Sequence, residues 1–95
     1  MEVRKKNRMI VTVLGKDQIG IIAWVSNRLA GFNINILYIS QTILQEFFTM
    51  IMVVDLDPSD IDAAELKKIL AEEGKQRGLQ VNVQHEDVFA YMHRI

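Results

Sequence analysis

Two kinds of hydrophobic pattern alternate along the chain. Short β-branched runs, beginning with residues 9–14, favour buried strands, whereas apolar residues three or four positions apart favour helices that bury one side. Ile21, Val25 and Leu29 give the first helix such a stripe. The pattern predicts four strands at residues 9–14, 33–44, 47–56 and 79–85, two helices at 20–30 and 62–77, and a short terminal helix at 87–94.

Residues suited to helix ends lie between these segments. Asp17 is expected to cap the first helix and Gly31 to end it, so that Asn33 opens the second strand. Ser59 or Asp60 is expected to cap the second helix, because a short polar side chain can accept a hydrogen bond from a free backbone N–H.

The order of the predicted elements is strand, helix, strand, strand, helix, strand. A tight turn at residues 45–46 joins the second and third strands. This order is typical of an α+β, ferredoxin-like βαββαβ sandwich, in which a four-stranded antiparallel sheet carries two helices on one face. The first and third strands then lie in the centre of the sheet. We expect one domain at residues 9–86, preceded by a basic N-terminal arm at 1–8 and followed by a C-terminal helical extension at 87–95.

The second strand is unusual for a strand at the edge of a sheet. No charged residue occurs from Leu29 to Gln45, although exposed edges normally carry charges or proline that prevent unwanted pairing. The third strand is apolar on both faces, and the two helices can cover only one. We expect a homodimer, a terminal segment at residues 88–92 folded across the open face, or both. The candidate dimer-interface residues are Ile36, Tyr38, Ile39 and Ile43.

The junction between the first strand and the first helix is a candidate binding site. Gly15 permits a tight exit from the strand, and the helix start presents free backbone N–H groups that suit a carboxylate or phosphate. An ordinary βα turn with a capped helix is the alternative interpretation. Together with residues 29–34, the motif Gly15-x-Asp17-x-x-Gly20-Ile21 resembles the signature of ACT domains.

This resemblance covers most of the chain, from Ile10 to about Gln84. Residues 39–42 and 47–50 make the chain similar, more narrowly, to the stand-alone, single-domain ACT proteins of prokaryotes and to one half of glycine-cleavage-type transcriptional repressors. ACT domains are small regulatory modules that bind amino acids and related metabolites. The resemblance therefore implies a ferredoxin-like sensor of a small molecule rather than an enzyme.

The resemblance also implies where a ligand would bind, namely in the loop at residues 15–20, between the first helix and the start of the second strand. Asp17 would meet the ammonium group of the ligand, or cap the helix that meets its carboxylate. The amide of Asn33 would close the site, from its own chain or from across the dimer. The implied ligand-binding residues are Gly15, Lys16, Asp17, Gln18, Ile19, Gly20, Asn33 and Ile34.

Composition narrows the classes of function. The chain has 95 residues, no cysteine, two histidines and a formal net charge of −1. These values exclude disulfides and thiolate chemistry, offer no spacing for a metal site, and argue against a broad nucleic-acid-binding face. The sequence predicts no secretory signal and no membrane-spanning run. We therefore expect a cytoplasmic protein without a metal or cofactor.

Two other functions stay open at the level of sequence. The first is a ligand-free ACT-like module that docks on an enzyme or a regulator. The second is an acylphosphatase-like enzyme, because acylphosphatases share the βαββαβ order and bind phosphate at the first loop. That loop supplies only Lys16 as a cation here, so we expect no enzymatic activity. RNA-recognition modules also share the topology, but the first strand lacks the aromatic residue on which a base would stack.

Overall fold

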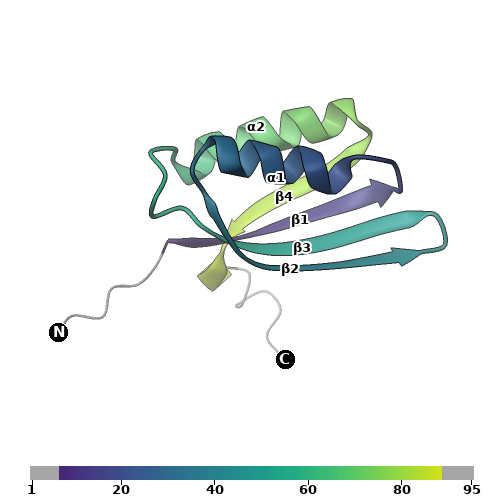
Figure 1. Ribbon diagram of the computed structural model, residues 1–95, viewed down its shortest axis with the longest axis horizontal. Coiled ribbons are helices and arrows are strands. Elements are labelled where there is room, and N and C mark those ends of the chain that lie inside the picture. The colour runs from purple at the N-terminus through teal and green to yellow at the C-terminus, as the bar shows by residue number, and fades with distance from the viewer. Residues whose placement is uncertain (1–6, 89–95) are drawn as a thin grey trace.

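Four strands and two helices follow one another in the predicted order in the computed structural model, which describes residues 7–88 (Figure 1). Residues 86–88 begin a helical turn, and the rest of the predicted terminal helix lies outside the described residues, as does most of the predicted basic arm. The elements are β1 (Arg8–Lys16), α1 (Ile21–Gly31), β2 (Asn35–Leu44), β3 (Phe47–Asp55), α2 (Ala63–Gln76) and β4 (Leu79–His85).

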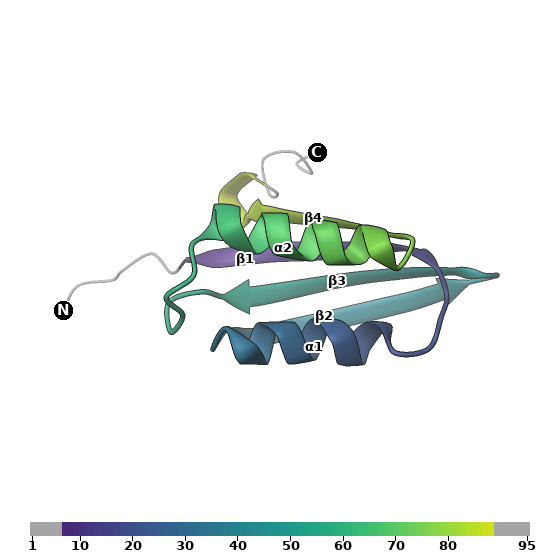
Figure 2. The same cartoon turned by 90° about the horizontal axis from the view of Figure 1, so that it is seen from above.

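The four strands form one antiparallel sheet in the order β2-β3-β1-β4. The two central strands are the first and third in the chain, as the topology predicts. Both helices lie on the same face of the sheet, with α1 beside β2 and α2 beside β4 (Figure 2). The predicted ferredoxin-like α+β fold is therefore confirmed. Neither α1 nor α2 covers the opposite face of the sheet.

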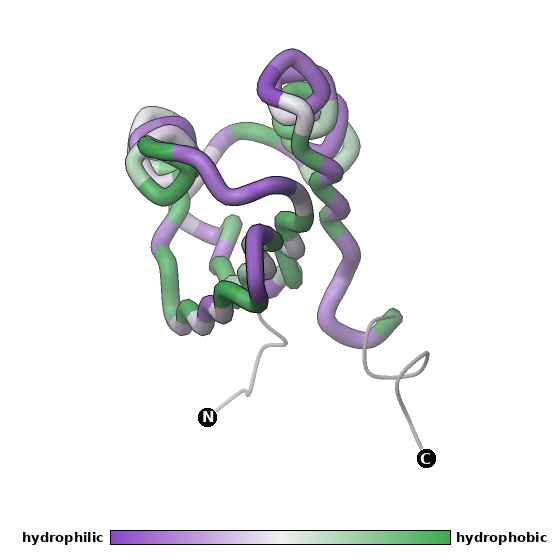
Figure 3. Tube along the Cα trace, turned by 90° about the vertical axis from the view of Figure 1, so that its right-hand side faces the viewer, coloured by the Kyte–Doolittle hydropathy of each residue, from purple (hydrophilic) through white to green (hydrophobic). Residues whose placement is uncertain are grey.

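The core fills the space between the sheet and the two helices. Alternate strand positions point into it, and this alternation of hydrophobic and hydrophilic residues is visible along the tube in Figure 3. The helices contribute residues at helical spacing, including Val25 and Leu29 from the predicted stripe of α1. The fully buried side chains are Val11, Val13, Val25, Leu29, Met50, Met52, Val54, Leu56, Leu66 and Leu70.

A β-bulge changes the direction of the side chains on β2. The pairing of β2 with β3 shifts between Ile36 and Tyr38, so that Leu37 is the extra residue. Ile36 pairs with the buried Val54, on the side of the helices, whereas Tyr38 pairs with Val53 on the opposite face. The bulge explains why apolar residues follow one another here without the alternation of a regular strand.

The first helix begins in a different way from the sequence-based prediction. Asp17 does not cap it; the N-cap residue is Gly20, in the left-handed conformation with φ 91°, and no side chain caps the first turn. The backbone N–H of Asp17 instead donates to the carbonyl oxygen of Glu46, 2.8 Å away. The prediction was wrong because the loop continues for three more residues before the chain becomes helical.

The end of α1 also differs from the prediction. Gly31 is the last helical residue, and Asn33 adopts φ 62° where a glycine would be usual. The N–H of Asn33 donates to the Ala30 oxygen and that of Ile34 to the Leu29 oxygen, both at 2.9 Å, which is the hydrogen-bond pattern of a Schellman motif. Asn33 therefore ends the helix and does not open β2, which starts at Asn35.

The cap of α2 is Asp62 and not Ser59 or Asp60. The Asp62 carboxylate accepts a hydrogen bond of 2.8 Å from the backbone N–H of Glu65, three residues later. The Ser59 hydroxyl accepts from the N–H of Ile61 at 3.1 Å and shapes the preceding turn. The turn and bend at residues 57–61 delay the helix, which starts at Ala63 and not directly after Ser59 or Asp60.

Replacing the cap gives a prediction for the stability of the fold. Asp62→Ala is expected to lower the free energy of unfolding by about 1 kcal/mol, because the N–H of Glu65 loses its acceptor. For a domain of this size the melting temperature should fall by about 4–8 °C. The matched control is Asp60→Ala, which removes the same charge two residues earlier. Equal losses in both variants would show that charge, and not the cap, is responsible.

Candidate functional site

The loop between β1 and α1 is exposed but tied to two neighbouring elements. The backbone of Asp17 bonds to Glu46 in the β2–β3 turn, as described above. The side-chain amide of Gln18 donates to the carbonyl oxygen of Arg77, at the end of α2, over 3.0 Å. Ile19, between these tethers, is completely exposed to solvent. The loop is therefore positioned from both sides while its tip stays accessible.

Gly15 has a packing role at the start of this region. It lies within β1, and a Cβ atom at this position would come within 2.6 Å of the Leu79 side chain and 3.1 Å of the Gly78 oxygen. The close approach of β1 to the beginning of β4 requires a residue without a side chain. Among the predicted ligand-binding residues, Gly15 is thus explained by packing.

A groove opens at the N-terminus of α1. Its volume is about 400 Å³. Since no side chain caps the helix and its first turn contains no acidic residue, the positive end of the helix dipole faces this space without compensation. The carboxylate of Asp17 has no hydrogen-bond or ion-pair partner among the described residues. The groove is lined by Asp17, Gln18, Gly20, Ile21, Ile22, Ala23, Gln41, Ile43 and Phe48.

Not every residue of the predicted loop lines this groove. The Lys16 ammonium lies 3.9 Å from the Glu46 carboxylate, in an exposed ion pair. Ile19 points into solvent. Conversely, Gln41 and Phe48 were missed, because they come from β2 and β3. The register places Gln41 opposite Met50 and Ile43 opposite Phe48, on the helix side of the sheet. On the helix side of β2, Gln41 is the one polar residue beside Ile36, Ile39 and Ile43, but the bulge that sets this side gave no signal in the sequence.

The remaining two predicted ligand-binding residues lie at the other end of α1. Asn33 and Ile34 line a second recess of about 430 Å³, together with Ala30, Asn35 and Pro58. The Asn33 side-chain amide donates to the Pro58 oxygen over 3.0 Å. Because α1 has 11 residues, its two ends are about 16 Å apart, and Figure 1 shows the chain entering and leaving the helix at these opposite ends. Within one chain, Asn33 therefore does not face the loop.

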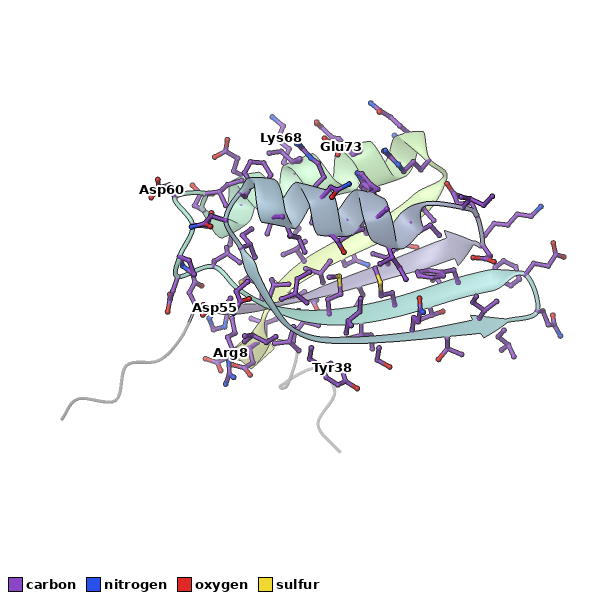
Figure 4. All side chains as sticks on the ribbon, viewed as in Figure 1. Arg8, Tyr38, Asp55, Asp60, Lys68 and Glu73 are labelled. Atoms are coloured by element: carbon purple, nitrogen blue, oxygen red, sulfur yellow. The ribbon has the colours of Figure 1, made fainter. Side chains whose placement is uncertain are left out.

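The predicted interface residues are accessible along the β2 edge. Tyr38, Ile39 and Ile43 are 57%, 43% and 54% exposed, and Ile36 is partly buried. Tyr38 projects away from the helices (Figure 4), whereas the register places the other three on the helix side. This apolar edge adjoins the groove, because Ile43 belongs to both.

Neither a metal site nor a membrane-spanning helix is found in the part of the chain that the structure describes. Across residues 7–88, no group of three or more histidine, cysteine or acidic side chains could hold a metal ion. Within the same range, no helix is long and apolar enough to cross a membrane.

Comparisons with known proteins identify the family. Residues 7–84 match the family model described as ACT domain. A UPF0237 protein of Methanocaldococcus jannaschii is 53% identical over 89 residues, covering 94% of this chain and 99% of the relative. A UPF0237 protein of Pyrobaculum aerophilum is 50% identical over 86 residues, with 90% and 96% covered.

Solved structures agree with this assignment. An ACT domain protein from Streptococcus pneumoniae superimposes with a TM-score of 0.78 at 38% identity, covering 90% of this chain and 96% of that one. A putative glycine cleavage system transcriptional repressor gives a TM-score of 0.74 at 22% identity, and the match takes in 84% of this chain and 46% of that one. The second likeness is one of fold alone. By family match, sequence identity and fold, the chain belongs to the ACT domain family of small-ligand regulatory domains.

Proposed function

We propose that this protein is a non-catalytic regulatory domain that binds an amino acid, or a closely related small carboxylate, between the subunits of a homodimer. The observation that carries the proposal is the groove of about 400 Å³ at the uncapped N-terminus of α1. Its volume falls in the range of small-molecule sites, about 300–1,000 Å³. A helix N-terminus without a cap leaves backbone N–H groups for an anionic ligand group.

The charges around the groove favour a zwitterion. A ligand carboxylate at the first turn of α1 would accept hydrogen bonds from the backbone N–H groups of Ile21 and Ile22, which no side chain caps. Asp17 would repel a second anionic group but attract an ammonium group a few ångströms away. Gln41 adds an amide that can donate or accept, and Phe48 adds an apolar wall. This arrangement supports an α-amino acid more than a simple acid or a phosphate.

A dimer would bring the two recesses of α1 together. Pairing of two β2 edges in antiparallel orientation is isologous, so the two chains are related by a two-fold axis. Since α1 lies beside β2 (Figure 2), the two copies of α1 would then run antiparallel next to each other. The Asn33 recess of one chain would lie beside the Asp17 loop of its partner. Asn33, whose amide nitrogen is held by Pro58, would offer its side-chain oxygen to the ligand's ammonium group.

The one cation of the loop supports a binding role over catalysis. A phosphate-cleaving site would aim a cation at the groove, but the ammonium of Lys16 is near the Glu46 carboxylate and does not line the groove. The groove thus offers a helix terminus, a carboxylate and an amide, which can hold a ligand, without an activated nucleophile beside them.

A thermal-shift screen of amino acids tests the proposal. A ligand at 100 times its dissociation constant adds about 2.7 kcal/mol to the free energy of unfolding. The melting temperature should therefore rise by roughly 10–20 °C. Asp17→Asn should abolish most of this shift and leave the unliganded melting temperature within about 2 °C of the parent value, because Asp17 caps nothing. Asp60→Asn, with the same change of charge on an exposed turn, should retain the full shift.

Two outcomes would contradict parts of the proposal. An undiminished shift in Asp17→Asn would mean that Asp17 does not meet the ligand. No shift with any amino acid or small carboxylate would favour the alternative function, a module with an empty site that docks on an enzyme or regulator.

A further inference from the structure

The free edge of β2 has a sequence that is nearly symmetric about Gln41. Residues 38–44 read Tyr-Ile-Ser-Gln-Thr-Ile-Leu. A hydroxyl residue lies one position to either side of Gln41, and an isoleucine lies two positions to either side. Such a strand complements itself when a second copy runs antiparallel beside it, because residues at equal distances from the centre then lie opposite each other.

The symmetry holds separately on the two faces of the strand. The pairing with buried residues of β3 places Ile39, Gln41 and Ile43 on the helix side. The other face carries, in order, Tyr38, Ser40, Thr42 and Leu44. If two copies of β2 pair about an axis at Gln41, isoleucine therefore meets isoleucine on one face and hydroxyl meets hydroxyl on the other.

Gln41 is a polar residue in apolar surroundings. Its side-chain amide forms no hydrogen bond with any of the residues that the structure describes. Its neighbour on β3 is Met50, which is fully buried, and Ile22 and Ala23 of α1 line the same groove. The amide thus lacks a hydrogen-bond partner within its own chain.

A second Gln41 is the partner that fits this amide. Residues opposite each other on antiparallel strands have Cβ atoms about 4.5–5.5 Å apart, so each amide can donate an N–H to the oxygen of the other. The second N–H of each amide stays available to a ligand in the groove. If the axis moves by one residue, Gln41 faces an isoleucine of the other copy, and its amide is covered without a partner, which is unfavourable.

The same alignment assembles the proposed two-chain site. Lys16 and Leu44 both pair with Phe47, so this end of the sheet lies beside the loop. Gln41 is three residues away, or about 10 Å, and a two-fold axis there sets the two loops about 20 Å apart along the strands. The ends of α1 are about 16 Å apart, which brings each loop level with the other copy's Asn33 recess. Moving the axis by one residue would displace the loop by about 7 Å.

We infer that Gln41 sets the register of the homodimer by pairing with Gln41 of a second copy. The inference rests on the proposed function, which requires two chains, and it names the residue that selects one alignment of their edges. The symmetric sequence identifies the occupant of the edge as this chain itself, because a strand of another protein has no reason to repeat it.

Disulfide cross-linking measures the register, since the chain has no cysteine of its own. Opposite residues of antiparallel strands have Cα atoms within the range that a disulfide spans. An axis at Gln41 joins a Ser40→Cys chain to a Thr42→Cys chain, whereas Ser40→Cys alone requires an axis at residue 40 and Thr42→Cys alone an axis at residue 42. When the two chains are mixed under reducing conditions and then oxidised, cross-linking should be about tenfold faster or more than in either chain alone.

Gln41→Ile tests whether the amide causes this preference. The variant makes the helix side of the edge uniformly isoleucine, so that shifted alignments no longer leave an amide without a partner. With this change in both chains, the mixture should cross-link within about threefold of each chain alone. Gln80→Ile, the same substitution at an exposed position of β4, is the matched control and should preserve the tenfold preference.

The possible failures are distinguishable. A preference that survives Gln41→Ile would show that another feature sets the register, and rapid cross-linking of Ser40→Cys alone would show a different register. Either result would overturn this inference and leave the homodimer in place. A parent chain that light scattering shows to be monomeric would overturn the homodimer as well, and would leave the edge to a strand of another protein.

Discussion

We expect the parent chain to be a dimer at micromolar concentrations, and Ile39→Lys to be a monomer of about 11 kDa at the same concentrations. Ile39 is 43% exposed in the single chain and lies on the helix side of the β2 edge. In an edge-paired dimer it would be covered by the partner's edge and by both copies of α1. Burying two unpaired ammonium groups there costs several kcal/mol. A cost of about 4 kcal/mol raises the dissociation constant roughly 1,000-fold.

Light scattering or sedimentation over a range of concentrations measures this effect. Gln80→Lys is the matched control, since it places the same charge on an exposed position of β4, the opposite edge of the sheet, and it should remain dimeric. If Ile39→Lys dimerises as well as the parent, the β2 edge is not the interface. If the parent itself stays monomeric at every concentration, the proposed two-chain site is wrong.

Trp24→Ala is expected to lower the free energy of unfolding by about 3–5 kcal/mol. Trp24 is 8% exposed and joins α1 to α2. Its Nε1–H donates to the Glu73 carboxylate over 2.8 Å, and the Arg77 guanidinium stacks over its ring at 4.5 Å. The contact is close, because a Cβ atom on Gly74 would lie 3.4 Å from the indole. The melting temperature should fall by more than about 12 °C, as followed by circular dichroism.

Trp24→Phe separates the packing of the ring from its hydrogen bond. Phenylalanine fills much of the same space but removes one partner of the Glu73 carboxylate, which keeps its ion pair with the Arg28 guanidinium, 3.0 Å from its second oxygen. A loss of about 1–2 kcal/mol is expected. If Trp24→Ala costs no more than Trp24→Phe, the ring does not hold the two helices together.

The elements of the fold were predictable because the signals that specify them are local. The strand at residues 79–85 was predicted with the bounds that the structure has, and the turn at 45–46 and the order of the strands were also correct. Alternating apolar residues determine such elements without reference to the rest of the chain.

The helix ends were less predictable because they depend on distant contacts. Gly31 is the better residue for a left-handed helix end, yet Asn33 takes this conformation. Two interactions favour it there: the burial of Ile34 next to Leu29, and the bond from the Asn33 amide to Pro58, 25 residues away. Asp17 likewise bonds through its backbone to the β2–β3 turn and not to its own helix. Neither partner can be read from the local sequence.

The candidate site was predictable in part. The loop with Asp17, Gln18 and Gly20 follows from the sequence motif and does line a groove. Gln41 could not be placed, because the face to which it points depends on the bulge at Leu37. The separation of Asn33 from the loop, by contrast, follows from the length of α1 alone and could have been derived from the predicted helix at 20–30.

The bulge at Leu37 also limits how far self-association can proceed. It confines the uninterrupted edge of β2 to residues 38–44, whose middle residue is Gln41. Two copies that pair about an axis at Gln41 use this edge completely, and none of it is left for a third. The other edge, β4, has seven residues and passes directly into the helical turn at 86–88, so its extended backbone ends at His85. In the proposed dimer, growth into an open-ended fibre, the hazard of an uncharged edge, would thereby be replaced by closure at two chains.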